Sequence, residues 1–270
     1  MNKISEIAII AGSGKFPFLL AKAAKSNGIR VIILAIASSA EKSIERIADK
    51  TYWVELGQGK KLIEILGKEK IEYAVMAGKV NKSTIIKQSV RLDEEAKNIL
   101  QRIKDKKDDT MLSAIADRLK DFDIELIDST LFLKNFMSGK GPLTKKRPDQ
   151  KQQQDIQFGF SIAKNMGALD IGQSIIIKDK AVIAVEAIEG TDEAIIRAGG
   201  LVGKGTVIVK VSKPSQDMRF DVPTVGLETL KAIKLSGASV LALESGKVLM
   251  LEKEDMIKEA DKMGICITGI

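Results

Sequence analysis

The chain has 270 residues, 44% of them hydrophobic and 29% charged, with a formal net charge of +7. This length is enough for two domains of ordinary size. The sequence contains no histidine and one cysteine, which excludes Ser-His-Asp and Cys-His catalysis, histidine-containing zinc sites and intrachain disulfides. Catalysis by this chain would therefore rest on carboxylates, Lys, Arg, hydroxyls, backbone amides or a metal with oxygen ligands, such as Mg²⁺ or Mn²⁺.

The positive charge favours an anionic partner, and nucleic acid, an acidic membrane surface and a phosphorylated small molecule all fit it. Aromatic residues make up only 4% of the chain, which is poor equipment for stacking on bases, so we expect no nucleic-acid partner. The sequence has neither a signal-peptide pattern nor a long apolar run, which predicts a cytoplasmic protein. The one cysteine, Cys266, has apolar neighbours and is expected to be buried and inert.

The first half alternates short apolar runs with amphipathic segments, which is typical of strands followed by helices. Strands are expected at 7–10, 30–35, 51–56, 71–77 and 125–127, and helices at 18–27, 60–68 and 111–119. This order predicts a Rossmann-like, doubly wound α/β domain over residues 1–133.

Two positions in this half are candidates for ligand contact. The turn Gly12-Ser13-Gly14 follows the first strand, but it lacks the third glycine of the dinucleotide fingerprint and the Gly-Lys-Ser/Thr ending of a P-loop. A phosphate or sugar contact and a purely structural turn both remain open for it. Lys79 follows the strand at 71–77, at the end where open α/β sheets bind ligands.

Residues 134–149 are rich in Gly, Lys and Pro and are expected to form a linker. Beyond them we expect helices at 150–166, 226–234 and 256–263, strands at 206–211 and 265–268, and hairpins formed by 174–177 with 181–187 and by 240–243 with 248–251. The stretch from Glu193 to Thr206 is expected to be a loop. This pattern predicts a mixed α+β domain over residues 150–270, without an internal repeat.

Two charged segments, 186–192 and 213–226, follow apolar strands of this second domain. Carboxylates, a Lys and an Arg lie there among turn-forming Gly and Pro residues, which suits a cation or phosphate site. A solvated surface loop is the alternative interpretation. Because both segments begin where strands end, we expect the fold to bring them together.

A series of motifs lies in order along nearly the whole chain. They are the segments 10–17, 77–80, 108–109, 167–173, 186–192, 213–226 and 244–246. Together they resemble the LpxI-type UDP-2,3-diacylglucosamine pyrophosphatases of lipid A biosynthesis. The first motif is generic, whereas the segments 186–192 and 213–226 are specific to this family.

The resemblance implies a hydrolase that depends on Mg²⁺ or Mn²⁺ and cleaves the pyrophosphate of UDP-2,3-diacylglucosamine with water. Its products would be UMP and 2,3-diacylglucosamine 1-phosphate. The implied partner is a lipid-linked nucleotide sugar, and the basic charge favours peripheral contact with the inner membrane. A homodimer is compatible with the sequence. A hydrolase of another nucleotide sugar and a non-catalytic nucleotide- or nucleic-acid-binding protein are the alternatives.

The resemblance also implies roles for individual residues. The catalytic candidates are Asp221, Asp217, Arg219 and Lys213, and the metal candidates are Asp221, Asp192 and Glu189. The candidates for substrate binding are Gly12, Ser13, Gly14, Lys79, Gln173, Thr191 and Thr224. Asp221 is the principal one, as a metal ligand or as the carboxylate that orients water. The alternative for Asp221 is a turn residue ahead of Pro223.

Overall fold

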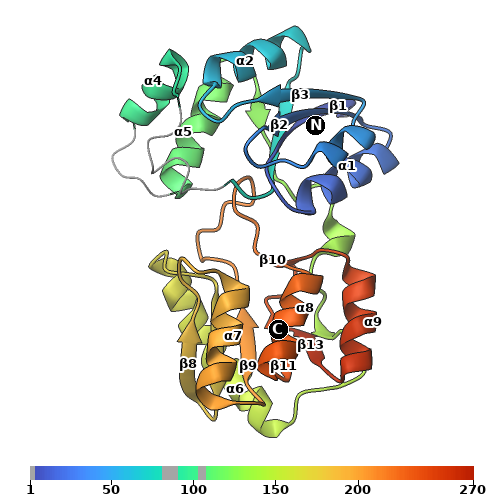
Figure 1. Ribbon diagram of the computed structural model, residues 1–270, viewed down its shortest axis with the longest axis vertical. Coiled ribbons are helices and arrows are strands. Elements are labelled where there is room, and N and C mark those ends of the chain that lie inside the picture. The colour runs from blue at the N-terminus through green and yellow to red at the C-terminus, as the bar shows by residue number, and fades with distance from the viewer. Residues whose placement is uncertain (1–3, 81–90, 103–107) are drawn as a thin grey trace. The chain divides into compact units, whose positions relative to one another are not determined.

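The computed structural model describes residues 4–80, 91–102 and 108–270 (Figure 1). The chain divides into two compact units. Unit 1 comprises Met1–Leu133 and Asp217–Asp221, and unit 2 comprises Lys134–Gln216 and Val222–Ile270. Residues 134–149, expected to be a linker, thus belong to unit 2. The segment Asp217–Asp221, expected within the second domain, groups with unit 1.

Unit 1 is built around a five-stranded sheet with parallel pairing and the strand order β3-β2-β1-β4-β5. Its strands are β1 (Glu6–Ala11), β2 (Arg30–Ile36), β3 (Lys50–Val54), β4 (Tyr73–Ala77) and β5 (Glu125–Leu126). Its helices among the described residues are α1 (Phe16–Ser26), η1 (Lys42–Arg46), α2 (Gly59–Lys68), α4 (Glu94–Arg102) and α5 (Asp108–Lys120). The predicted α/β arrangement with a parallel sheet is confirmed, whereas α4 was not predicted.

Both faces of this sheet are buried. Leu66 of α2 and Leu119 of α5 pack with Ile32 of β2 in one cluster. Ile33 follows in β2, points to the opposite face and is also fully buried. Leu20 of α1, a helix that contacts β1, β2 and β4, is buried as well. Apolar residues on both faces are typical of parallel strands, which explains the continuous apolar runs in this half of the sequence.

Unit 2 contains a six-stranded mixed sheet with the order β6-β13-β11-β9-β7-β8 and a two-stranded sheet of β10 and β12. Its strands are β6 (Gly141–Pro142), β7 (Ser174–Lys178), β8 (Ala181–Val185), β9 (Val207–Lys210), β10 (Thr224–Val225), β11 (Val240–Leu243), β12 (Leu249–Met250) and β13 (Cys266–Gly269). Its helices are η2 (Lys134–Phe136), α6 (Gln150–Ala168), α7 (Thr191–Val202), α8 (Leu227–Ser236) and α9 (Lys253–Met263).

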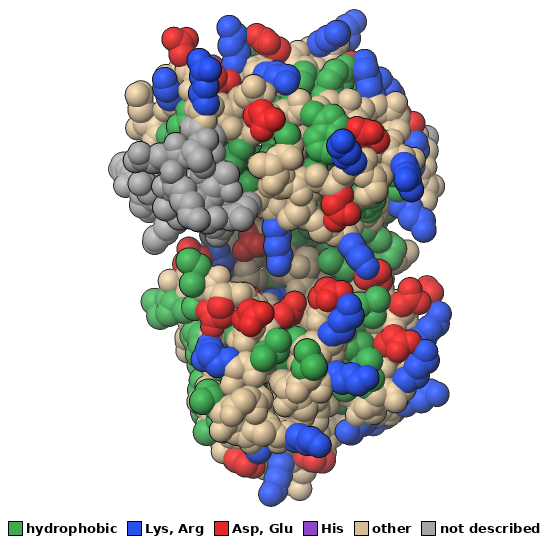
Figure 2. Space-filling view, viewed as in Figure 1, with side chains coloured by type: hydrophobic (Ala, Val, Ile, Leu, Met, Phe, Trp, Pro, Cys, Tyr) green, Lys and Arg blue, Asp and Glu red, His purple; other side chains and the backbone are tan. Residues whose placement is uncertain are grey.

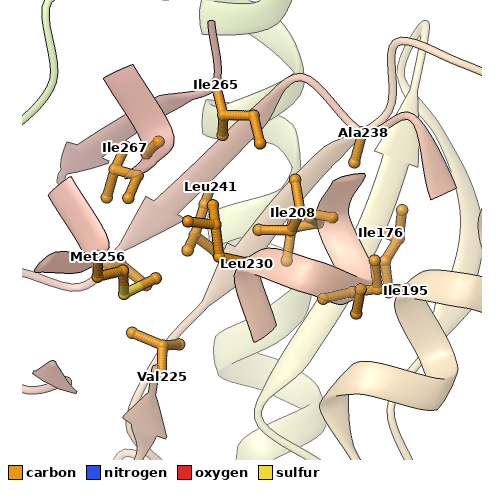
Figure 3. Close-up of a cluster of buried hydrophobic side chains, with 14 of the residues drawn as sticks. Ile176, Ile195, Ile208, Val225, Leu230, Ala238, Leu241, Met256, Ile265 and Ile267 are labelled. Atoms are coloured by element: carbon orange, nitrogen blue, oxygen red, sulfur yellow. The ribbon is translucent and has the colours of Figure 1, made fainter. Parts of the chain in front are cut away.

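Helices cover both faces of the larger sheet. One face forms a cluster with α7, α8 and α9, in which Ile176, Ile208 and Leu241 of the strands meet Ile195 of α7 and Leu230 of α8 (Figure 3). The alternate strand residues form a second cluster with α6. The single cysteine lies in that second cluster, where burial raises the pKa of its thiol, so the expected burial of Cys266 is confirmed.

Two expectations for this half are wrong. Residues 240–243 and 248–251 do not form a hairpin, because β11 pairs in parallel with β9 and β13, and β12 pairs in parallel with β10. The stretch expected to be a loop forms most of α7, despite Gly199 and Gly200. Separately, within the described ranges no helix has the length and hydropathy that crossing a membrane requires.

Candidate functional site

Polar side chains of unit 2 gather at one edge of its six-stranded sheet. β8, β9 and β11 run in the same direction, because β7 is antiparallel to β8 and β9, and β11 is parallel to β9. Their carboxyl ends therefore lie at one edge, which carries Glu186, Lys210 and Glu244. The segment 186–192 and the start of 213–226 both follow strands that end there.

A buried lysine organises this edge. Lys210 is 4% exposed, and its Nζ donates to Thr191 Oγ1 at 2.7 Å and to Ser174 Oγ at 3.1 Å. The same Nζ lies 3.6 Å from Glu186 Oε2, and Thr191 Oγ1 donates to Glu186 Oε1 at 2.7 Å. Burial acts to raise the pKa of Glu186, but Lys210 and the two hydroxyls outweigh it, so this pKa lies below its ordinary value. The network thus joins an ionised carboxylate to the first residue of α7.

Asp192 and Glu189 flank the beginning of α7 and differ in their surroundings. Asp192 lies in the first turn, where the helix dipole favours negative charge. Its Oδ1 is buried and accepts no hydrogen bond from the residues that the structure describes. Glu189, in contrast, accepts from Arg197 at 2.6 Å and from the Ala187 amide at 3.2 Å. The pKa of Glu189 lies below its ordinary value. The largest cause is a hydrogen bond to its own backbone, and the pairing with Arg197 lowers the pKa further.

The segment 167–173 packs against both charged segments. A Cβ atom on Gly172 would lie 2.0 Å from the Glu186 carbonyl oxygen, so only glycine allows this approach of the two backbones. Asp170 forms an ion pair with Lys213, whose Nζ lies 2.5 Å from Asp170 Oδ1. The Gln173 carbonyl accepts from the Val211 amide at 2.9 Å, and Gln173 itself is 9% exposed.

A second polar group lies further along the same edge. Glu244 follows β11 and accepts from Lys164 at 3.0 Å on each carboxylate oxygen. It also accepts from the Ser212 amide at 2.8 Å and from Ser212 Oγ at 3.0 Å. Because donors from α6 and from the segment after β9 converge on it, this carboxylate is well satisfied and holds three elements together.

In unit 1, the Gly12-Ser13-Gly14 turn is paired with the chain after β4. Ser13 and Lys79 exchange two backbone hydrogen bonds of 2.8 and 3.1 Å, and Ser13 Oγ donates to the Lys79 carbonyl at 3.0 Å. A Cβ on Gly12 would lie 2.5 Å from the Lys79 oxygen, and one on Gly78 would lie 2.6 Å from the Ser13 oxygen. These contacts support the structural interpretation of this turn. A phosphate or sugar contact by Gly12, Ser13, Gly14 or Lys79 stays a prediction.

The segment Asp217–Asp221 is also anchored in unit 1. Ser129 Oγ lies 2.8 Å from the Met76 carbonyl oxygen, near the end of β4, and 3.0 Å from the Arg219 carbonyl oxygen. Its single hydroxyl hydrogen can donate to either of them. Phe220 packs against the core of unit 1. Asp217 and Arg219 form a close ion pair of 2.6 Å, which lowers the pKa of the carboxyl group. Asp221, the principal candidate, lies on the exposed surface.

The donor chemistry of the metal candidates fits Mg²⁺, but their arrangement fits it only in part. Carboxylate oxygens are the hard ligands that this ion prefers. The buried Oδ1 of Asp192 is suited to this role, whereas Glu189 would have to leave Arg197. Across 4–80, 91–101 and 110–270, no three acidic side chains lie close enough together to hold a metal ion.

Sequence reasoning missed Lys210, Ser174 and Lys164. A signal for Lys210 exists, because this lysine follows the apolar run 207–209 and precedes Val211. A charged residue inside a buried strand requires a partner. Thr224, a predicted substrate contact, lies in β10 and pairs with Leu249 of β12, in the two-stranded sheet.

Comparison with known proteins gives matches over nearly the whole chain. Residues 6–136 match the LpxI N-terminal domain and residues 139–268 match the LpxI C-terminal domain. A UDP-2,3-diacylglucosamine pyrophosphatase LpxI from Caulobacter vibrioides is 27% identical over 98% of this chain and 97% of its own length.

Solved structures resemble the chain only weakly. The biotin carboxylase domain of the Hydrogenobacter thermophilus 2-oxoglutarate carboxylase is 11% identical with a TM-score of 0.29, over 67% of this chain and 36% of that one. Phosphoribosylglycinamide synthetase from Anaerococcus prevotii is 16% identical with a TM-score of 0.25, over 72% and 42%. The chain thus spans less than half of either structure, and neither supports a conclusion. The two domain matches, in contrast, establish that the chain belongs to the LpxI family.

Proposed function

We propose that this protein hydrolyses the pyrophosphate of UDP-2,3-diacylglucosamine to UMP and 2,3-diacylglucosamine 1-phosphate in lipid A biosynthesis. The observation that carries the proposal is the end-to-end similarity to a pyrophosphatase of that name, over 98% of this chain. As a further part of the proposal, unit 1 is Rossmann-like, which the parallel strand order β3-β2-β1-β4-β5 supports. The reaction transfers a phosphoryl group to water, so it needs neutralised phosphate oxygens and an oriented water molecule.

Positive side chains of the motif segment are suited to neutralising the pyrophosphate. Lys213 and Arg219 each carry a carboxylate partner, Asp170 and Asp217, which fixes the direction of the cation. We assign these two cations to the phosphate oxygens, with Lys79 as a third. Planar Arg219 can meet two phosphate oxygens at once, while Lys213 acts as a point charge.

Mg²⁺ would be held by Asp221 and Asp192, with Glu189 as a further ligand, and when bound it would supply charge neutralisation and a more acidic water. Asp221 alternatively orients the attacking water by itself. Thr191 already bridges Lys210 and Glu186, so its hydroxyl would position the start of α7 as well as contact substrate. Gly12, Ser13, Gly14, Gln173 and Thr224 complete the proposed substrate contacts.

The test is UMP release from UDP-2,3-diacylglucosamine by the purified chain, with Mg²⁺, with Mn²⁺ and with EDTA. Asp221→Asn should lower the rate by about 100- to 1,000-fold, as expected when one electrostatic group is removed. Asp255→Asn, on the exposed surface of α9, is the matched control and should keep full activity. Unchanged UMP release in the presence of EDTA would contradict the proposed metal requirement. The reaction itself fails if the folded protein releases no UMP under any of the three conditions.

A further inference from the structure

Two loops beside the candidate site expose large aliphatic side chains. Ile188 is fully exposed, at 104%, while Leu169 is 72% exposed and Ile171 is 46% exposed. Leu169 and Ile171 lie between α6 and β7, and Ile188 lies between β8 and α7. Figure 2 shows hydrophobic side chains gathered beside acidic ones on unit 2. Exposed apolar patches of this kind mark surfaces that contact a protein or a membrane.

The two loops approach each other at their bases, so the three side chains are carried by neighbouring loops. The absence of a side chain at Gly172 lets its backbone reach the Glu186 carbonyl. The first loop is also fixed by the hydrogen bond from the Ile171 amide to the Met166 carbonyl at 3.3 Å. The second is fixed by the bond from the Gly190 amide to the Ala187 carbonyl at 3.2 Å. Leu169, Ile171 and Ile188 are named the aliphatic patch below.

The charges around the aliphatic patch are largely neutralised. Ion pairs hold the carboxylates of Asp170, Glu186 and Glu189, with partners Lys213, Lys210 and Arg197 respectively. The sequence of the two loops, 169–173 and 186–190, contains no Lys or Arg. Burying the aliphatic groups of this surface in a membrane would lower the free energy, whereas anionic headgroups would add little electrostatic attraction.

We propose that the aliphatic patch docks the protein on a lipid bilayer by inserting Leu169, Ile171 and Ile188 among the acyl chains. The proposal rests on the proposed function, because a diacylated substrate resides in a lipid surface. The patch lies at the sheet edge that carries Glu186 and Lys210, so docking brings that edge to the membrane. Short apolar insertions at the level of the headgroups are enough for reversible attachment of this kind.

Binding is measured first, without turnover, by sedimentation with phosphatidylcholine vesicles. The wild type should bind, and raising the salt concentration should leave binding unchanged, because the interaction is apolar. Ile188→Ser and Leu169→Ser should each lower the coefficient for partitioning from solution to vesicles by about tenfold. Leu235→Ser and Leu201→Ser, at positions 78% and 64% exposed on α8 and α7, are the matched controls and should bind as the wild type does.

Activity then separates the membrane from the acyl chains of the substrate itself. A short-chain, monomeric diacyl substrate should be hydrolysed equally by wild type and by Ile188→Ser. Long-chain substrate in vesicles should be hydrolysed about tenfold more slowly by the variant, in proportion to its weaker binding. An equal loss on both substrates would assign the patch to the substrate's chains and overturn the docking proposal. So would wild-type binding that requires anionic lipid or disappears in salt. If no substrate is hydrolysed, the proposed function fails while the sedimentation result still decides docking.

Discussion

Lys210 Nζ lies 3.6 Å from Glu186 Oε2, and the two side chains are 6% and 14% exposed. The lysine ends β9 and the carboxylate follows β8, so the pair spans β7, which lies between those strands. Removing one member of such a pair leaves the other charge buried without compensation, which costs more than the intact pair contributes. The pair therefore fixes the geometry at the start of α7 more than it adds to overall stability.

Replacing Lys210 with Met should destabilise unit 2 by about 3 kcal/mol, because Glu186 would keep its charge in a buried site. Urea unfolding monitored by circular dichroism measures the free energy of unfolding. The double variant Lys210→Met with Glu186→Gln should recover part of this loss, since no charge remains unpaired. Lys178→Met is the control, because Lys178 Nζ donates to a backbone carbonyl, that of Val202, at 2.8 Å. Equal losses for Lys210→Met and Lys178→Met would contradict the pairing argument.

Asp192→Asn tests the buried oxygen that has no hydrogen-bond donor among the described residues. If this oxygen binds Mg²⁺, the ion should raise the melting temperature of the wild type and not that of the variant. Without the ion, the variant should lose only the helix-dipole interaction, about 0.3–1 kcal/mol, because no described hydrogen bond to Oδ1 is lost. Glu193→Gln is the matched control, since Glu193 lies in the same first turn of α7 and is exposed. A Mg²⁺-induced shift that survives in Asp192→Asn would remove Asp192 from the ligand set.

Glu69 gives unit 1 a defined dependence on pH. Its carboxylate accepts from Lys50 at 2.6 Å and from Arg30 at 3.1 Å, and Tyr52 also donates to it. Led by the Lys50 contact, these donors lower its pKa from 4.5 to about 2. The ionised form is therefore favoured by folding. Its contribution is complete above about pH 4.5 and is lost as the pH falls toward 2.

Glu69→Gln should accordingly lower the free energy of unfolding at pH 7 and flatten its decline between pH 4.5 and pH 2. Urea titrations at several pH values measure both effects. Glu64→Gln on α2 is the control, because its side chain is 64% exposed and lies 4.0 Å from Lys60. A Glu69→Gln variant with the acid dependence of the wild type would contradict the role of this carboxylate.

The sequence predicted those parts of the fold that depend on neighbours along the chain. Apolar runs such as the one around Ile33 indicate strands buried on both faces, and these strands were found. Pairing between strands depends on distant residues instead. The stretch after β11 has the local turn signals of a hairpin, yet Leu249 pairs with Thr224 of β10. No local pattern distinguishes these two partners.

The candidate site was predictable to a similar degree. The charged segments 186–192 and 213–226 were expected to converge. Glu186 meets Lys210, which precedes the second segment, whereas Asp217–Asp221 of that segment groups with unit 1. Which unit holds a segment was not predictable, because it depends on anchors such as Phe220 and Ser129 in unit 1. The buried partners of Lys210 likewise come from strands that are separate in sequence, so their arrangement requires the sheet order.

The two adjacent glycines of α7 supply a further test of packing. A Cβ on Gly199 would lie 2.6 Å from Cα, Cβ and the carbonyl oxygen of Ser236 in α8, so the two helices cross there at backbone contact. A Cβ on Gly200 would meet no atom within 4 Å. The low helix propensity of the two glycines explains why the sequence did not predict this helix. Of the two, only Gly199 is needed for the packing against α8.

Gly199→Ala should therefore destabilise unit 2 by about 1–3 kcal/mol, because α7 and α8 must move apart. Gly200→Ala should stabilise it by about 0.5–1 kcal/mol, because alanine favours the helix and meets open space. Thermal and urea unfolding of both variants measure the difference, and each protein serves as the matched control of the other. The same sign of change at both positions would mean that helix propensity, and not the crossing at Ser236, decides the cost.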